Sequence, residues 1–100
     1  MKEIYLSRST RSDKKYMVKV DGKTIHFGAK GYENYGGVGK ERHTDEERKK
    51  RYITRHKERE NWTKSGITTA GFWSRWLLWN KPTLQQNIKD IQQRFNVKIL

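Results

Sequence analysis

The stretch KYMVKVDGKTIHF (residues 15–27) decides the fold class, because apolar and polar side chains alternate on both sides of an Asp-Gly pair. Alternation with a period of two is typical of a half-buried β-strand. Asp21-Gly22 favours a two-residue type I′ turn, in which both residues need positive φ. The sequence therefore predicts an antiparallel β-hairpin, and residues 2–7 read as a further short strand, giving two or three strands in all.

Helical patterns follow the hairpin. Thr44-Asp45-Glu46-Glu47 reads as a capping box with Thr44 at the N-cap, and it predicts a highly charged helix that ends near Glu60. Residues 70–79 predict a second helix, which Thr68 or Thr69 can cap and Lys81-Pro82 ends. The second and third helices together span residues 68–95.

The third helix begins with another capping box, Thr83-Leu84-Gln85-Gln86. Its apolar residues recur at helical spacing and form one stripe, made by Leu84, Ile88, Ile91 and Phe95. Residues 97–100 are expected to close the chain as a short strand beside the N-terminal one.

These elements predict an α+β fold in one domain, residues 1–100, because a chain of this length leaves no room for a second domain. The domain divides into a hairpin region (1–28), a glycine-rich loop (29–43), a basic helix (44–60) and two C-terminal helices (68–95).

Composition excludes several classes of protein. The chain has no Cys, so it can form neither a disulfide framework nor a Cys-ligated zinc site. The longest apolar cluster, residues 72–79, is far shorter than the roughly 20 residues that cross a bilayer. No apolar N-terminal run indicates a signal peptide. We therefore expect a soluble protein made in a cytosol or nucleus, with no membrane span.

The chain is strongly basic, with 23 Lys and Arg against 11 Asp and Glu and a net charge of +12. The excess is spread over the whole length: +5 in residues 1–43, +3 in 44–66 and +4 in 67–100. A basic tail would indicate a disordered arm, whereas an even spread favours a folded body that meets an acidic partner. That partner can be nucleic acid or an acidic protein surface.

The densest basic run lies in the helix predicted at 44–60. Arg48, Arg51 and Arg55 share one helical face, which Arg59 extends. Guanidinium groups at this spacing can follow a row of phosphates or carboxylates. The candidate anion-binding or nucleic-acid-binding residues are Arg48, Lys49, Arg51, Arg55 and Arg59. The alternative is a solvated helix with internal ion pairs such as Glu46 with Lys50 and Glu47 with Arg51.

The stretch FWSRWLLW (residues 72–79) is unusually rich in indole rings. One short helix cannot easily bury three Trp side chains on different faces, so some are expected at the surface. Exposed Trp beside Arg is typical of a protein–protein anchor, and it can also stack on bases. The alternative places all three in the core. The candidate interface residues are Trp62, Trp73, Arg75, Trp76 and Trp79.

No motif predicts catalysis. Gly36–Lys40 fails the P-loop pattern because Lys40 is followed by Glu41 rather than Ser or Thr. His43, Asp45 and His56 could form the metal site of a small nuclease only if the fold brought them together. We therefore expect a non-enzymatic protein with no cofactor, no metal and no small-molecule substrate.

Much of the chain resembles a family of small basic proteins encoded by large double-stranded DNA viruses of eukaryotes, with relatives in algal and amoebal giant viruses. The resemblance covers roughly two-thirds of the chain, and its most specific part is the block from Thr69 to Pro82. The other matching residues are Phe27-Gly28, Gly31-Tyr32, Arg48-Lys49, Tyr52, Arg55-His56, Glu60-Asn61-Trp62 and Gly66.

That resemblance implies a setting, because the family carries no assigned activity. It implies a virion protein that is made in the host cytoplasm or nucleus. The leading expectation is a structural protein, a minor capsid or capsid-associated component, whose Trp-rich helix anchors on viral capsid proteins. The alternative is a DNA- or RNA-binding protein that uses its basic helix on phosphates.

Overall fold

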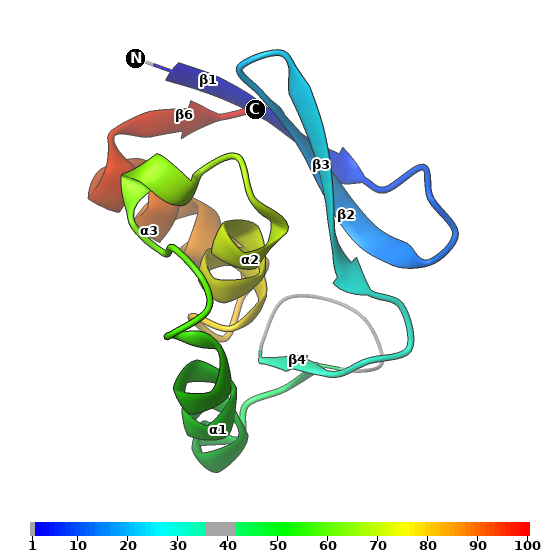
Figure 1. Cartoon of the computed structure of the whole chain (residues 1–100), viewed down its shortest axis with the longest axis vertical. Coiled ribbons are helices and arrows are strands. Elements are labelled where there is room, and N and C mark those ends of the chain that lie inside the picture. The colour runs from blue at the N-terminus through cyan, green and yellow to red at the C-terminus, as the bar shows by residue number, and fades with distance from the viewer. Residues whose placement is uncertain (1, 36–41) are drawn as a thin grey trace.

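The computed structural model describes residues 2–35 and 42–100 and confirms the α+β class. Strands β1 (Lys2–Arg8), β2 (Lys14–Val20) and β3 (Lys23–Ala29) are antiparallel neighbours, and β6 (Val97–Ile99) pairs with β1 in parallel. The strand order is β3-β2-β1-β6. Helices α2 and α3 lie on one side of this sheet, and α1 lies at the lower end of the molecule (Figure 1). The strands predicted at residues 2–7 and 97–100 are therefore present, as β1 and β6.

The predicted hairpin is confirmed in its turn and its register. Asp21 and Gly22 have φ of 52° and 75°, as a type I′ turn requires. Val18 lies opposite Ile25, and Tyr16 lies opposite Phe27. The buried side chains of both strands face the helices, so the alternation read from the sequence puts one face of the sheet in the core.

Helix α1 (Glu46–His56) is shorter at both ends than predicted. Its N-cap is Asp45 rather than Thr44, because the Asp45 carboxylate accepts hydrogen bonds from the backbone N–H groups of Glu47 and Arg48. A carboxylate also complements the positive end of the helix dipole. At the other end, the carboxylate of Glu60 accepts from the Trp62 indole at 3.0 Å, which lies in the segment after the helix.

Helix α3 (Leu84–Phe95) has the predicted capping box. The Thr83 hydroxyl accepts from the Gln86 N–H at 3.1 Å, and the Gln86 side chain accepts from the Thr83 N–H at 3.2 Å. Asn96 ends the helix in the left-handed conformation, with φ of 54°, and the chain then turns directly into β6.

The predicted helix over 70–79 is only partly α-helical. Thr69 caps α2 (Ala70–Trp73), which continues as the π-helical turn η2 (Ser74–Leu78). The Trp79 N–H donates to the Ser74 carbonyl at 3.0 Å. A π-turn holds one residue more than an α-turn, so the side chains that follow it point in different directions from those on a regular α-helix. No helix within residues 2–35 and 42–100 is long and apolar enough to cross a membrane.

The predicted glycine-rich loop, 29–43, contains two short strands. β4 (Asn34–Tyr35) pairs in parallel with β5 (Arg42–His43), and Tyr35 is buried. The Gly36–Lys40 stretch, which the sequence analysis compared with a P-loop, lies outside the described residues. A single 3₁₀ turn, η1 (Lys64–Gly66), precedes α2.

One buried polar side chain joins α3 to the end of η2. Asn87 is 0% exposed, and its amide donates to the carbonyls of Leu77 at 2.8 Å and Lys81 at 3.2 Å. Its own carbonyl accepts from the Lys81 N–H at 2.7 Å. Asn87 therefore satisfies backbone groups that the end of a helix and the loop around Pro82 leave without partners.

Replacing Asn87 should destabilise the fold more than replacing an exposed neighbour. Asn87→Ala leaves these backbone groups unpaired, so we expect a loss of about 2–3 kcal/mol in the free energy of unfolding. The measurement is urea unfolding followed by circular dichroism. Gln93→Ala, at an exposed position of the same helix, should change stability by less than about 0.5 kcal/mol. Equal effects of the two substitutions would contradict this role for Asn87.

Candidate anion-binding site

The one buried residue of helix α1 is the aromatic Tyr52. Tyr52 is buried, and its ring stacks on Trp79 with 4.4 Å between centroids and 3° between planes. The ring of His56 stacks on Tyr52 at 4.4 Å. Because Tyr52 points inward, the opposite side of α1 faces solvent.

Three of the five predicted cations, Arg48, Lys49 and Arg59, form ion pairs or hydrogen bonds within the protein. The side chains of the other two, Arg51 and Arg55, form none with the described residues. Arg48 forms ion pairs with Glu33 at 2.6 Å and with Asp45 at 3.6 Å. The Arg59 guanidinium donates back to the Arg55 carbonyl at 3.2 Å. The prediction that Arg48 shares one anion-binding face with Arg51 and Arg55, and that Arg59 extends it, is therefore not supported by the contacts of Arg48 and Arg59.

Lys49, the third engaged cation, acts together with Arg75. Lys49 Nζ donates to the Asn80 carbonyl at 2.6 Å, and Arg75 Nη1 donates to the Trp79 carbonyl at 2.7 Å. These carbonyls follow the end of η2, where a helix presents unsatisfied acceptors and partial negative charge. Burial lowers the pKa of both Lys49 and Arg75. Both residues therefore cap a helix, although the sequence assigned one to an anion site and the other to a protein interface.

Lys50, Arg51 and Arg55 remain exposed on the outer side of α1. Within the described parts of the chain, none of the three side chains forms an ion pair, and Lys50 and Arg51 lack the expected partners Glu46 and Glu47. Glu46 instead accepts a hydrogen bond from the Tyr35 hydroxyl, which raises the pKa of Tyr35. The internal ion pairs that would have neutralised this face are therefore not formed.

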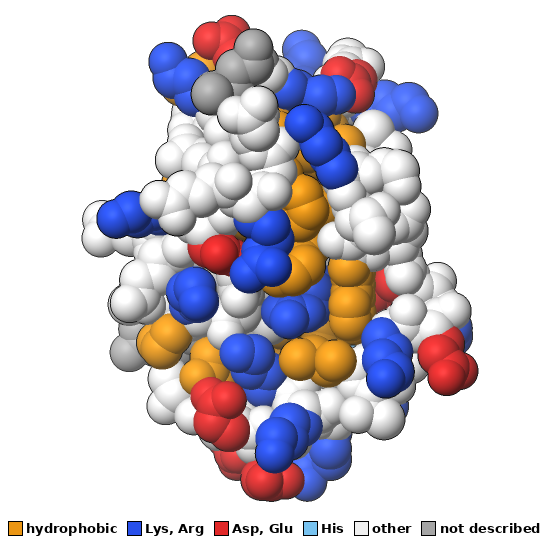
Figure 2. Space-filling model, turned by 90° about the vertical axis from the view of Figure 1, so that its left-hand side faces the viewer, with side chains coloured by type: hydrophobic (Ala, Val, Ile, Leu, Met, Phe, Trp, Pro, Cys, Tyr) orange, Lys and Arg blue, Asp and Glu red, His pale blue; other side chains and the backbone are white. Residues whose placement is uncertain are grey.

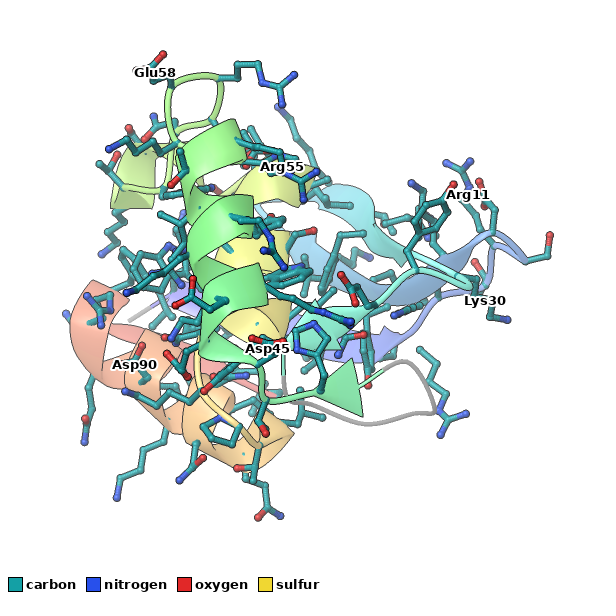
Figure 3. The ribbon with its side chains drawn as sticks, turned by 90° about the horizontal axis from the view of Figure 1, so that it is seen from below. Arg11, Lys30, Asp45, Arg55, Glu58 and Asp90 are labelled. Atoms are coloured by element: carbon teal, nitrogen blue, oxygen red, sulfur yellow. The ribbon has the colours of Figure 1, made fainter. Side chains whose placement is uncertain are left out.

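These three cations line an open groove of about 340 Å³ together with Thr54. In Figure 3, Arg55 extends from α1 toward the side of the molecule that carries Lys30 and Arg11, and away from Asp90. Of these four residues, the sequence predicted Arg51 and Arg55 as anion-binding but not Lys50 and Thr54. Lys50 and Thr54 are four residues apart, as Arg51 and Arg55 are, so the same helical spacing could have identified them.

Two of the four candidate indole rings are buried and two are half-buried. Trp73 is 0% exposed and Trp79 is 7% exposed, so burial removes both from the predicted interface. Trp62 and Trp76 are half-buried, and the Trp76 indole donates to the Trp62 carbonyl at 2.9 Å. Trp73 packs against the rings of Phe27 and Phe72, and Trp79 packs against those of Tyr52 and His43.

Cations lie against the two half-buried rings. Arg75 is 5.4 Å from the Trp62 ring centroid and 4.4 Å from that of Trp76, and Arg94 is also 4.4 Å from Trp76. Figure 2 shows one face of the molecule, on which hydrophobic side chains form a broken band with Lys and Arg side chains beside and between them. Arg75 belongs to this internal stack, and Trp62, Trp76 and Arg94 keep some surface for a partner.

The three candidate metal ligands are not brought together. Asp45 is occupied as the N-cap of α1, and its N–H donates to His43 Nδ1 at 3.1 Å. His56 lies at the far end of the helix, roughly 16 Å away along its axis. Among residues 2–35 and 42–100, no group of three or more His, Cys, Asp or Glu side chains could hold a metal ion. The nuclease alternative therefore loses its proposed site.

The buried Tyr52 hydroxyl should make the stability of the fold sensitive to alkali. Burial, with a smaller effect of Glu60, raises the pKa of Tyr52 above its ordinary value of 10.0. Stability is then unaffected below that value and falls as the pH rises above it, because the unfolded chain ionises first. Tyr52→Phe should remove up to about 1.4 kcal/mol per pH unit of this loss, measured by urea unfolding between about pH 9 and pH 11. Tyr5→Phe, at an exposed ring, is the control and should leave the slope unchanged.

Comparison with known proteins gives a family but no activity. No curated protein and no solved structure matches the chain. Residues 4–56, which run from β1 to the end of α1, match a family of unknown function, DUF5754. The match includes the whole hairpin and every residue of the groove on α1. Because it covers more than half of the sequence, the chain belongs to the family of unknown function DUF5754.

Proposed function

We propose that this chain is a non-enzymatic nucleic-acid-binding protein that contacts the phosphate backbone with the outer side of α1. The observation that carries this proposal is the set of three exposed cations, Lys50, Arg51 and Arg55, which have no acidic partner among the described residues. Unpaired Lys and Arg that share one helix side attract a polyanion and release its counterions on binding.

The charge of the whole molecule supports a polyanion as the partner. The net charge of +12 is spread along the chain, so the molecule as a whole attracts anions. In the viral setting that the sequence resemblance implies, the polyanion would be the packaged genome. No aromatic residue lines the groove, which favours contacts with phosphates over contacts with bases.

An acidic protein surface, such as that of a capsid protein, is the second candidate partner. The observation in its favour is that Trp62 and Trp76 are only half-buried and that Arg94 lies on the Trp76 ring. Trp and Arg are the residues that most often contribute binding energy in protein interfaces. In this candidate the chain is a minor capsid component, and two half-buried indole rings contact the partner instead of the four that the sequence suggested.

Neutralising the outer side of α1 should weaken binding to nucleic acid and reduce its salt dependence. The triple variant Lys50→Gln, Arg51→Gln, Arg55→Gln removes up to three phosphate contacts. The slope of log affinity against log salt on duplex DNA should therefore fall by up to about 2.7, since each contact contributes about 0.9. Fluorescence anisotropy across a salt series gives the slope.

A matched control removes the same charge from the sheet. Lys19→Gln, Lys23→Gln, Lys98→Gln changes three exposed lysines that form no ion pair among the described residues. This variant should keep most of the slope if α1 makes the contacts. Equal losses for the two triple variants would mean that net charge alone attracts the nucleic acid. No binding by the unmodified protein at low salt would end the proposal.

The capsid candidate makes a different prediction. In purified particles of a virus that encodes the chain, cross-linking should join its lysines to a capsid protein. Arg94→Glu should reduce the cross-linked product, because it replaces the cation on Trp76 with a carboxylate that an acidic partner repels. Absence of the chain from purified particles would exclude this candidate.

A further inference from the structure

We infer that the groove on α1 is a discrete phosphate-binding site, in which the Thr54 hydroxyl acts together with Lys50, Arg51 and Arg55. The inference rests on the proposed function and names the group that the site takes. That group is a single tetrahedral phosphate, either a diester of a nucleic-acid backbone or free phosphate. If only the overall positive charge attracted phosphate, the phosphate would have no defined binding position. Its affinity would then not depend on an uncharged hydroxyl group.

The helix places the four side chains around one point. Lys50 and Thr54 are four residues apart, as are Arg51 and Arg55, and the two pairs are offset by one residue. Side chains at this spacing are neighbours on a helix surface. All four line the same open groove, so one small anion can lie within reach of their donors.

The Thr54 hydroxyl is available as a donor. In the interior of a helix, a Thr hydroxyl often bonds to the carbonyl four residues before it. Thr54 is exposed, and its hydroxyl makes no hydrogen bond to any residue in 2–35 or 42–100. An exposed hydroxyl beside three cations can donate to a phosphate oxygen without breaking a contact within the protein.

The charges around the groove leave it positive. Like charges at a spacing of four residues repel, and Arg51 and Arg55 have no carboxylate within ion-pair distance in the described structure to reduce that repulsion. The nearest acids on the chain are Glu47, one turn before Arg51, and Glu58, which lies past the end of α1 in Figure 3. A bound phosphate would supply the missing negative charge, and each guanidinium can donate two N–H groups to its oxygens.

The test uses a pair of variants that differ only in the hydroxyl. Thr54→Val keeps the β-branched shape and removes the donor, whereas Thr54→Ser keeps the donor. Inorganic phosphate is titrated into each labelled protein, and the amide shifts of residues 46–56 give the affinity. We expect Thr54→Val to weaken phosphate binding about fivefold, because a hydrogen bond to a charged group is lost, and Thr54→Ser to stay within about twofold of the unmodified protein.

Duplex DNA is the second probe and separates the two sources of phosphate. Thr54→Val should weaken duplex binding without changing the salt slope, since no charge is removed, whereas Arg51→Gln should lower both. Glu47→Gln should strengthen binding of both probes, because it removes the acid nearest to Arg51. Unfolding midpoints of all variants confirm that each one is folded.

The outcomes distinguish failure of the site from failure of the proposed function. In one outcome, the unmodified protein binds duplex DNA, and Thr54→Val binds both phosphate and duplex DNA as tightly as the unmodified protein. The contact is then diffuse and this inference is wrong, while the proposed function stands. If phosphate shifts α1 and Thr54→Val weakens it but duplex DNA does not bind, the site holds free phosphate and the proposed function fails. Shifts caused by phosphate outside α1 would also overturn the site.

Discussion

The stack of Tyr52 on Trp79 is the interaction on which the position of α1 depends. Helix α1 has few other apolar side chains, so without this ring pair its outer cations would have no fixed direction. Trp79 is available for the stack because η2 ends there and turns its indole toward α1. Lys49, on α1, closes the same junction with a hydrogen bond to the Asn80 carbonyl, and Arg75 holds the neighbouring Trp79 carbonyl. An apolar contact and a charged contact thus orient a helix that its own sequence would barely stabilise.

Two local signals in the sequence predicted the structure correctly. The Asp21-Gly22 turn and the Thr83 capping box each need only a few neighbouring residues, and both are present. The Trp block was misjudged because its environment depends on distant elements. Neither the π-turn at Ser74–Leu78 nor the stacking of Trp79 on Tyr52 can be read from residues 70–79 alone.

In the candidate site, too, local spacing predicted some features, and contacts with distant residues decided the others. Helical spacing placed Arg51 and Arg55 on one side of α1, because that depends only on helix geometry. Spacing could not show which cations the fold itself engages. Lys49 finds a backbone carbonyl 31 positions later, and Arg48 finds Glu33 on the preceding loop. Of the five predicted cations, Arg51 and Arg55 remain, and they line a groove together with Lys50 and Thr54, which the prediction did not include.

The parallel contact between β1 and β6 has a consequence for synthesis. On the ribosome, the first strand to emerge must wait for residues 97–99 before its second edge is covered, and an uncovered strand edge invites pairing with other chains. During that interval the nascent protein carries a large excess of positive charge, and mutual repulsion between neighbouring copies opposes such pairing. We therefore expect the basic composition to oppose aggregation of the incomplete chain.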